Sequence, residues 1–175
     1  AVQSSLRLGC PLVDRTHPDF AALKVLVTVL GGYFGSRLMS NIREEKGYTY
    51  GISASIASFP FQGYLAIGTE TDNEYVEPCI REVKYEMRRL QEELIPEQEL
   101  SMVKNYMIGE MCRNYEDPFS LSDAWIFVKT AGLENNFFQT LAEKIRRVKA
   151  EELRDLAFRY FQSENMIEVV AGKKM

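Results

Sequence analysis

The segment GSRLMSNIREEKGYTYG, residues 35–51, changes from a helical pattern to an extended one within a few residues. Ser36 can cap a helix, and the pattern of apolar and charged residues then stays helical as far as Gly47, a residue type that commonly ends helices. From Tyr48 onward, aromatic and β-branched residues alternate with small ones, which predicts a strand. The segment therefore predicts a helix joined directly to a strand at a sharp corner.

Two side chains that can donate hydrogen bonds flank this corner. Arg43 lies about one helical turn before Gly47, and Tyr50 lies in the strand that follows. Spacing alone favours a structural role for both, with Arg43 stabilising the negative end of the helix dipole and Tyr50 packed in the sheet. The alternative is a functional pair that projects beside the corner and binds a substrate.

The rest of the chain supplies further elements on both sides of the corner. The pattern predicts a strand over 4–13, a buried helix over 20–30, a hairpin of strands over 48–59 and 64–69, about five helices between 76 and 161, and a last strand over 166–171.

This order predicts an α+β fold, in which helices pack on one face of an antiparallel sheet. The last strand must return to the sheet after a largely helical excursion. A chain of 175 residues suits one hydrophobic core, and the sequence shows no linker, repeat or low-complexity tract. We therefore expect residues 1–175 to form a single domain.

Composition argues against several classes of partner. The chain has 21 Lys and Arg against 25 Asp and Glu, and its net charge of -4 disfavours nucleic acid, whose binding depends on neutralising phosphates. No apolar run approaches the roughly 20 residues of a membrane helix, and the first residues lack the pattern of a signal peptide. We expect neither nucleic acid nor membrane as a partner. Because the chain begins without Met, we also expect it to be part of a longer protein.

The cysteines and the single histidine restrict metal chemistry. Cys10, Cys79 and Cys112 are far apart in apolar or helical sequence, and we expect them to be buried free thiols. Such thiols are compatible with a reducing compartment, so we expect a cytoplasmic location, with periplasmic and organellar locations left open. His17 stands alone, so a metal site with two imidazoles cannot be built here. We expect no metal or cofactor in this chain.

Three other patterns favour structural roles. The glycines between 31 and 35 follow a helix and lack the Lys-Ser/Thr end of a phosphate loop, which predicts a tight turn. The basic residues between 144 and 149 are balanced by nearby acids and indicate a solvated helix face. An aromatic cluster is most simply core, and the alternative is an exposed face that contacts a peptide or a partner and favours self-association. Its members are Tyr115, Phe119, Trp125, Phe127, Phe137 and Phe138.

Four stretches in order carry a family resemblance: LGGYFGSRL (30–38), IREEKGYTY (42–50), GTETD (68–72) and VVAG (169–172). Together with the first strand, its helix and the hairpin, they resemble the non-catalytic, C-terminal half of pitrilysin or insulinase-type zinc peptidases, the group that includes mitochondrial processing peptidase. The resemblance covers essentially the whole chain. It implies the same α+β fold as the order of elements.

The resemblance also implies a division of labour. The zinc motif His-x-x-Glu-His, absent here, lies in the other half of such peptidases, so this chain is expected to be inert alone. Arg43 and Tyr50 are the implied catalytic and substrate-binding residues, which orient an extended peptide and donate hydrogen bonds to its carbonyl oxygen. The implied partners are the peptide and a zinc-bearing homologous half, in the same longer chain or a separate subunit.

The expected function is therefore the substrate-binding half of a zinc-dependent endopeptidase. The alternative is a catalytically inactive structural or scaffold subunit of the same fold, since relatives of this fold also serve as core subunits of respiratory complexes. Retention of both Arg43 and Tyr50 favours the peptidase component.

Overall fold

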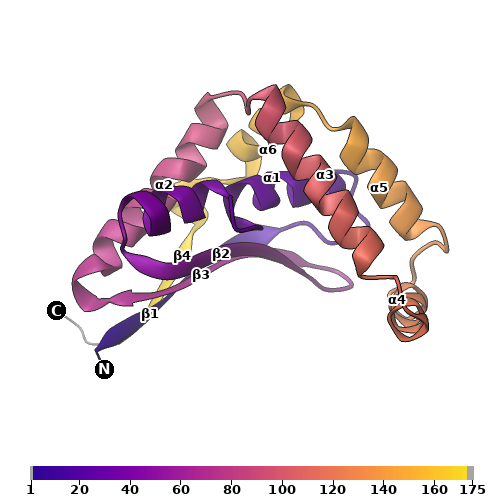
Figure 1. Cartoon of the computed structure of the whole chain (residues 1–175), viewed down its shortest axis with the longest axis horizontal. Helices are drawn as coiled ribbons and strands as arrows, with labels where there is room; N and C mark the ends of the chain where they lie inside the picture. Colours follow the sequence, from indigo (N-terminus) through magenta and orange to yellow (C-terminus); the bar gives the residue numbers. More distant parts are fainter. Residues whose placement is uncertain (1, 173–175) are drawn as a thin grey trace.

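The computed structural model describes residues 2–172, and its elements follow the predicted order (Figure 1). In chain order they are β1 (Gln3–Leu12), α1 (Phe20–Gly31), the π-helical turn η1 (Met39–Glu45), β2 (Thr49–Ser58), β3 (Gly63–Asp72), the 3-10 turn η2 (Asn73–Tyr75), α2 (Val76–Glu92), α3 (Glu97–Arg113), α4 (Pro118–Thr130), α5 (Phe137–Arg147), α6 (Ala150–Tyr160), the 3-10 turn η3 (Ser163–Asn165) and β4 (Ile167–Ala171).

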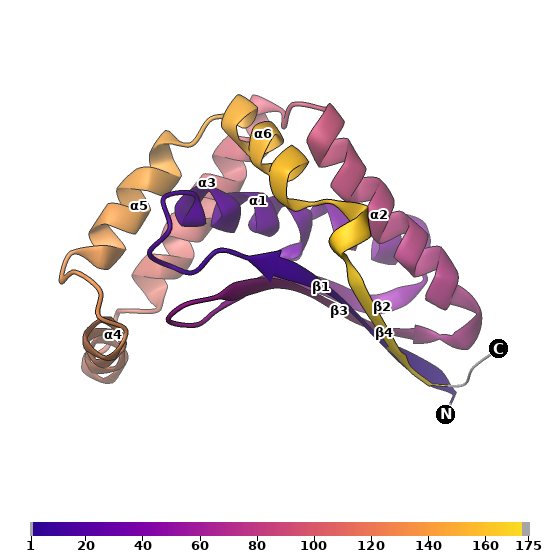
Figure 2. The same ribbon diagram turned by 180° about the vertical axis from the view of Figure 1, so that it is seen from behind.

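The four strands form one antiparallel sheet in the order β2-β3-β1-β4. Figures 1 and 2 show the helices on one face of this sheet, with the other face uncovered. The last strand pairs with β1, residues 167–171 against 5–9, after the five helices α2 to α6. The predicted fold class and the predicted return of the last strand are confirmed.

The hydrophobic core lies between the sheet and the helices. Along β1, alternate residues such as Leu6, Leu8 and Cys10 are buried because they point toward the helices, as the period of two requires. Helix α1 is buried on nearly all sides, since it contacts β2 on one side and α3, α5 and α6 on the others. Its apolar sequence therefore reflects a central position in the core.

The predicted corner is present, but its helix is wound more widely than expected. It ends at Gly47, whose φ of 66° suits glycine. The backbone N–H of Lys46 donates to the carbonyl of Asn41, five residues back, at 3.1 Å. The side-chain amide of Asn41 donates to Glu86 of α2 at 2.7 Å, a contact that fixes this turn from outside its own segment. The local sequence predicts a helix here. In the structure this helix is a π-helical turn, and the hydrogen bond from Asn41 to Glu86 joins it to α2.

Two expectations about burial are wrong. Cys112 is exposed, because it lies five residues after Met107 and thus away from the buried side of α3. The aromatic residues of α4 are not core either: Phe119 is 83% exposed, and Val128 is the buried residue of this helix. Figures 1 and 2 give the reason, since α4 lies at one end of the molecule, beyond the sheet.

The rest of the aromatic cluster is half-buried. The Tyr115 and Phe138 rings lie 4.8 Å apart, and Phe137 packs against the core. The aromatic side chains of α4 are therefore exposed, and their contact with a peptide or a partner stays a prediction. Within residues 2–172, no helix is long and apolar enough to cross a membrane.

Candidate functional site

The corner brings the two predicted site residues to one hollow. This hollow has a volume of about 640 Å³ and lies where η1 passes into β2. Its lining residues are Gln3, Arg43, Glu44, Gly47, Tyr48, Thr49, Tyr50, Glu70 and Asp72. Arg43 and Tyr50 therefore face the same space, although they belong to different elements.

Arg43 contributes a supported cation to this hollow. Its guanidinium carbon lies 4.6 Å from the centre of the Phe34 ring, a cation–π contact. The nearest carboxylate contact joins its Nη1 to Glu44 at 3.9 Å, and the Arg43 side chain is 34% exposed. The guanidinium is thus held in place while part of it stays accessible to a ligand.

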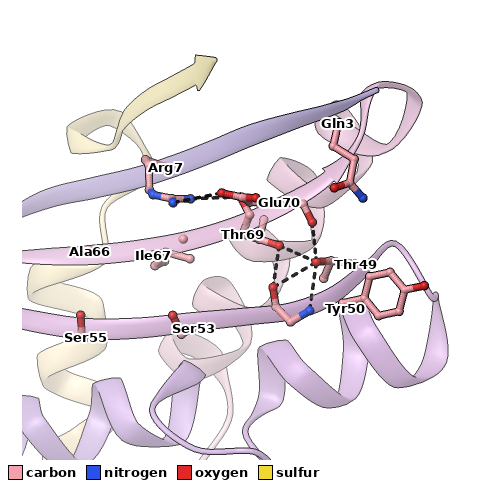
Figure 3. Close-up of a pocket in the computed structure, with 12 residues that line it drawn as sticks. Gln3, Arg7, Thr49, Tyr50, Ser53, Ser55, Ala66, Ile67, Thr69 and Glu70 are labelled. Atoms are coloured by element: carbon pink, nitrogen blue, oxygen red, sulfur yellow. Dashed lines mark hydrogen bonds and ion pairs between the residues drawn. The ribbon is translucent and has the colours of Figure 1, made fainter. Parts of the chain in front are cut away.

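Tyr50 contributes an exposed phenol. It is 92% exposed, and Figure 3 shows its ring pointing away from the strand. The structural interpretation, in which Tyr50 packs in the sheet, is therefore wrong. A hydroxyl in this position is available to a ligand.

A β-bulge causes this exposure. Thr49 pairs with Thr71 and Ile52 with Thr69, so Tyr50 and Gly51 together stand opposite the single residue Glu70. An extra residue of this kind redirects the side chains around it. The sequence pattern of alternating residues gives no sign of the bulge.

Two threonines, which the sequence reasoning did not single out, hold the bulge. The Thr49 hydroxyl donates to the carbonyl of Glu70 at 2.7 Å and accepts from the N–H of Gly51 at 3.1 Å. The Thr69 hydroxyl donates to the carbonyl of Gly51 at 2.9 Å (Figure 3). These bonds satisfy backbone groups that the bulge removes from regular pairing. A Thr-x-Gly sequence opposite a second Thr was the available signal.

A second hollow continues from Tyr50 along the uncovered face of the sheet. Its volume is about 560 Å³, and small side chains form much of its floor: Gly51, Ser53, Ser55, Ala66 and Gly68. Arg7 and Glu70 form an ion pair of 3.7 Å across it, with both side chains more than half exposed (Figure 3). An extended chain can approach this floor closely because few long side chains rise from it.

The electrostatics of the corner are mixed. Arg43 lies 3.9 Å from the carboxylate of Glu44, and Glu70 and Asp72 line the same hollow. Behind it, Tyr48 stacks on Tyr75 with ring centres 4.8 Å apart, and the charge of Glu74 raises the pKa of the Tyr75 phenol. The hollow thus offers both donors and acceptors of hydrogen bonds.

These residues do not fit a zinc site. Within the described part of the chain, no group of three or more His, Cys, Asp and Glu side chains is placed to hold a metal ion. Cys10 and Cys79 are buried, and burial raises the pKa of Cys10 to about 11, which disfavours the thiolate that a metal requires. His17 accepts a hydrogen bond from the N–H of Asp19 at 3.1 Å.

Sequence comparison finds relatives among zinc-protease-like proteins. Residues 2–107 match the family described as Peptidase M16 inactive domain. The non-peptidase homolog YmxG of Helicobacter pylori is 29% identical over 98% of this chain and 40% of its own length. An uncharacterized zinc protease YmxG of Bacillus subtilis is 29% identical over 65% of this chain and 28% of its own length. The chain thus spans less than half the length of these relatives.

Structural comparison gives the same fold. A peptidase M16 inactive domain from Pseudomonas fluorescens superimposes with a TM-score of 0.90 at 23% identity, covering 100% of this chain and 42% of that one. A putative zinc protease from Bordetella pertussis Tohama I gives a TM-score of 0.81 at 17% identity, covering 98% of this chain and 94% of that one. At these identities, the likeness establishes the fold alone.

Proposed function

The chain belongs to the peptidase M16 family as an inactive domain, and on this premise we propose that it is the substrate-positioning half of a zinc-dependent endopeptidase. The observation that carries the proposal is the hollow that Arg43 and Tyr50 both line. Tyr50 is 92% exposed there, at the β-bulge that Thr49 and Thr69 hold. In this proposal the exposed phenol and the guanidinium, which line the same hollow, are the two donors that bind the ligand.

In this proposal the two side chains hold a carbonyl group of the peptide. The Arg43 guanidinium donates charged hydrogen bonds, which are stronger than neutral ones, and the Tyr50 hydroxyl donates from the opposite side of the corner. Donors fixed before the reaction stabilise negative charge as it develops on the oxygen, because they need no reorganisation at that moment. Phe34 contacts the Arg43 guanidinium, and the threonines of the bulge hold the backbone from which the Tyr50 side chain projects.

The uncovered face of the sheet supports the extended part of the same peptide. The hollow along this face adjoins the corner hollow, since Gln3, Thr49, Tyr50 and Glu70 line both. Its small side chains allow a peptide backbone to lie near the strands. The Arg7–Glu70 pair offers one charge of each sign to substrate side chains.

The remainder of the active site belongs to a partner in this proposal. The donor set of this chain does not fit zinc, so the metal and its activated water are assigned to a homologous half. That half corresponds to the part of the longer relatives that this chain does not span. The residues of this chain bind and orient peptide and supply hydrogen bonds.

Tyr50→Phe tests the proposal, because it removes the hydroxyl and keeps the ring. With the zinc-bearing half present, in the longer protein or as a co-expressed subunit, cleavage of a fluorogenic peptide should fall about 100- to 1000-fold. Stability should change by about 0.5 kcal/mol or less, since the side chain is exposed. Tyr64→Phe is the matched control: Tyr64 lies in β3 and lines neither hollow. Full activity of Tyr50→Phe would contradict the proposed role.

A scaffold function is the second candidate. The name of the Helicobacter pylori relative, a non-peptidase homolog, favours it. In that case the assembled protein would cleave no peptide, and Tyr50→Phe would leave assembly unchanged. The same assay therefore separates the two functions.

A further inference from the structure

The π-helical turn η1 borders two hollows. Arg43 and Glu44 line the corner hollow, whereas Asn41, Glu45 and Lys46 line a larger one that α2 and α3 also border. This second hollow has a volume of about 770 Å³, and most of the side chains that line it are charged or polar, so we call it the polar hollow. Contacts that fix η1 at the polar hollow therefore also fix the backbone from which Arg43 projects.

Asn41 is the buried link between η1 and α2. It is 7% exposed, and its side-chain amide donates to Glu86 at 2.7 Å and to Glu82 at 3.1 Å. Glu86 is itself only 2% exposed, and its carboxylate also accepts from Arg89 at 3.3 Å. Hydrogen bonds to a charged acceptor are stronger than neutral ones, so this is a firm attachment of the turn.

Lys46 attaches the other end of the same turn to α2. Its backbone N–H donates to the carbonyl of Asn41 at 3.1 Å, which closes the π turn, and its ammonium lies 3.7 Å from the carboxylate of Glu82. The two residues joined by the π hydrogen bond thus both contact α2 through their side chains. Arg43 lies between them in the chain.

The segment that leads into Arg43 is also costly to fold. Within the part of the chain that the structure describes, three buried side-chain atoms have no hydrogen-bond partner: Ser36 Oγ, Arg37 Nη1 and Asn41 Oδ1. All three lie in the short stretch before Arg43. Unpaired buried polar atoms lower stability and are few in folded proteins. The π form adds to this, since it is rare and is found most often at functional sites.

We propose that Asn41 is a positioning residue: its hydrogen bond to Glu86 holds η1 in the π form and thereby places the Arg43 guanidinium at the corner hollow. An apolar side chain at position 41 would avoid the unpaired oxygen, so core stability alone does not account for this residue. Without the attachment to α2, the turn is free to tighten to the ordinary α form, which changes the direction of Arg43. The catalytic consequence rests on the proposed function.

Asn41→Leu tests the proposal first in the chain itself. The variant should fold, because Glu86 keeps its contact with Arg89. We expect the Arg43 Nε–Hε resonance to move and the affinity for a fluorescein-labelled unstructured peptide to fall at least about fivefold. Ile145→Val is the control for a general loss of stability, because Ile145 is fully buried on α5, which lines neither the corner hollow nor the polar hollow. It should change neither readout. An unmoved resonance in Asn41→Leu would overturn the proposal.

Exchanging donor and acceptor tests the pairing. At pH 8, Asn41→Asp places a carboxylate against that of Glu86, and the resonance and affinity should change as in Asn41→Leu. Adding Glu86→Gln supplies an amide that donates to the new carboxylate, so the double variant should recover the resonance position and most of the affinity. A loss of packing at position 41 predicts no such recovery, and its absence would overturn the role of the Asn41–Glu86 bond.

Cleavage with the zinc-bearing half present separates this inference from the proposed function. Asn41→Leu should lower kcat about 10- to 100-fold, since a small misplacement of a catalytic group has effects of this size. If Tyr50→Phe loses activity while Asn41→Leu keeps both full activity and the original Arg43 resonance, only the positioning role fails. If the resonance moves in Asn41→Leu but neither variant alters cleavage, the positioning of Arg43 stands and the proposed function fails.

Discussion

The Arg43 guanidinium rests on the Phe34 ring at 4.6 Å, so a residue of the turn after α1 supports a side chain of η1. Phe34 is itself 65% exposed, and its burial therefore contributes little to the core. Its contact with Arg43 is the clearest structural role that the described residues give it.

Phe34→Leu should loosen Arg43 without unfolding the chain. A cation–π contact at an exposed site contributes about 0.5–1 kcal/mol, so binding of a fluorescein-labelled unstructured peptide should weaken about two- to fivefold. Fluorescence anisotropy measures the affinity, and the Arg43 Nε–Hε resonance should move as it loses the ring current. Phe34→Tyr keeps the ring and should behave like the original chain. If the resonance moves in Phe34→Leu but the peptide affinity stays unchanged, Phe34 has only a structural role.

Arg37→Met should destabilise the whole fold. The Arg37 side chain is 10% exposed and donates two hydrogen bonds to Glu99, at 2.9 and 3.0 Å, which tie the start of the corner helix to α3. Removing one partner of a largely buried pair leaves the other charge uncompensated, at a cost of about 2–3 kcal/mol. Urea unfolding measures the loss. The Arg37→Met, Glu99→Met double variant should recover part of it, and no recovery would argue against a paired role.

The three thiols should differ in reactivity. Cys112 is exposed, whereas Cys10 and Cys79 are buried and burial raises the pKa of both thiols, that of Cys10 to about 11. At pH 8, a chromogenic disulfide reagent should therefore modify one thiol per folded chain and three after unfolding. Cys112→Ser should abolish the fast reaction. A second fast thiol in that variant would show that the core opens locally.

The start of α4 should be sensitive to acid. Hydrogen bonds from Ser120 hold the pKa of Asp117 below its ordinary value of 3.8. Since the folded pKa is lower than the unfolded one, the stabilisation by this cap is complete above pH 3.8 and is lost as the pH falls through the folded pKa. Trp125, the single tryptophan, lies on α4, so its fluorescence reports the change.

Asp117→Asn separates this effect from general acid unfolding. Asn also caps helices but does not titrate, so α4 should lose the acid transition and keep its structure at neutral pH. Asp117→Ala should weaken α4 at every pH. An unchanged acid transition in Asp117→Asn would assign it to other carboxylates.

Much of the fold is encoded in short-range patterns. The alternation around Leu6 and Leu8 and the helical spacing of Val83, Met87 and Leu90 mark which side of each element is buried, because strand and helix periods are local properties. Gly47 likewise marks the end of the corner helix through its own backbone preference. For these reasons the sequence predicts the elements, their order and the corner between Arg43 and Tyr50.

The exposure of the site depends on contacts between distant residues. Tyr50 points outward because Thr69, from the neighbouring strand, helps to hold a bulge that the alternation of residues along β2 does not predict. The π turn that carries Arg43 is anchored through Asn41 to Glu86 of α2. The sequence by itself thus determined which residues could form the site. The tertiary structure decided that both reach one hollow and that α4 stays uncovered, because side-chain direction and burial depend on neighbours that folding brings together.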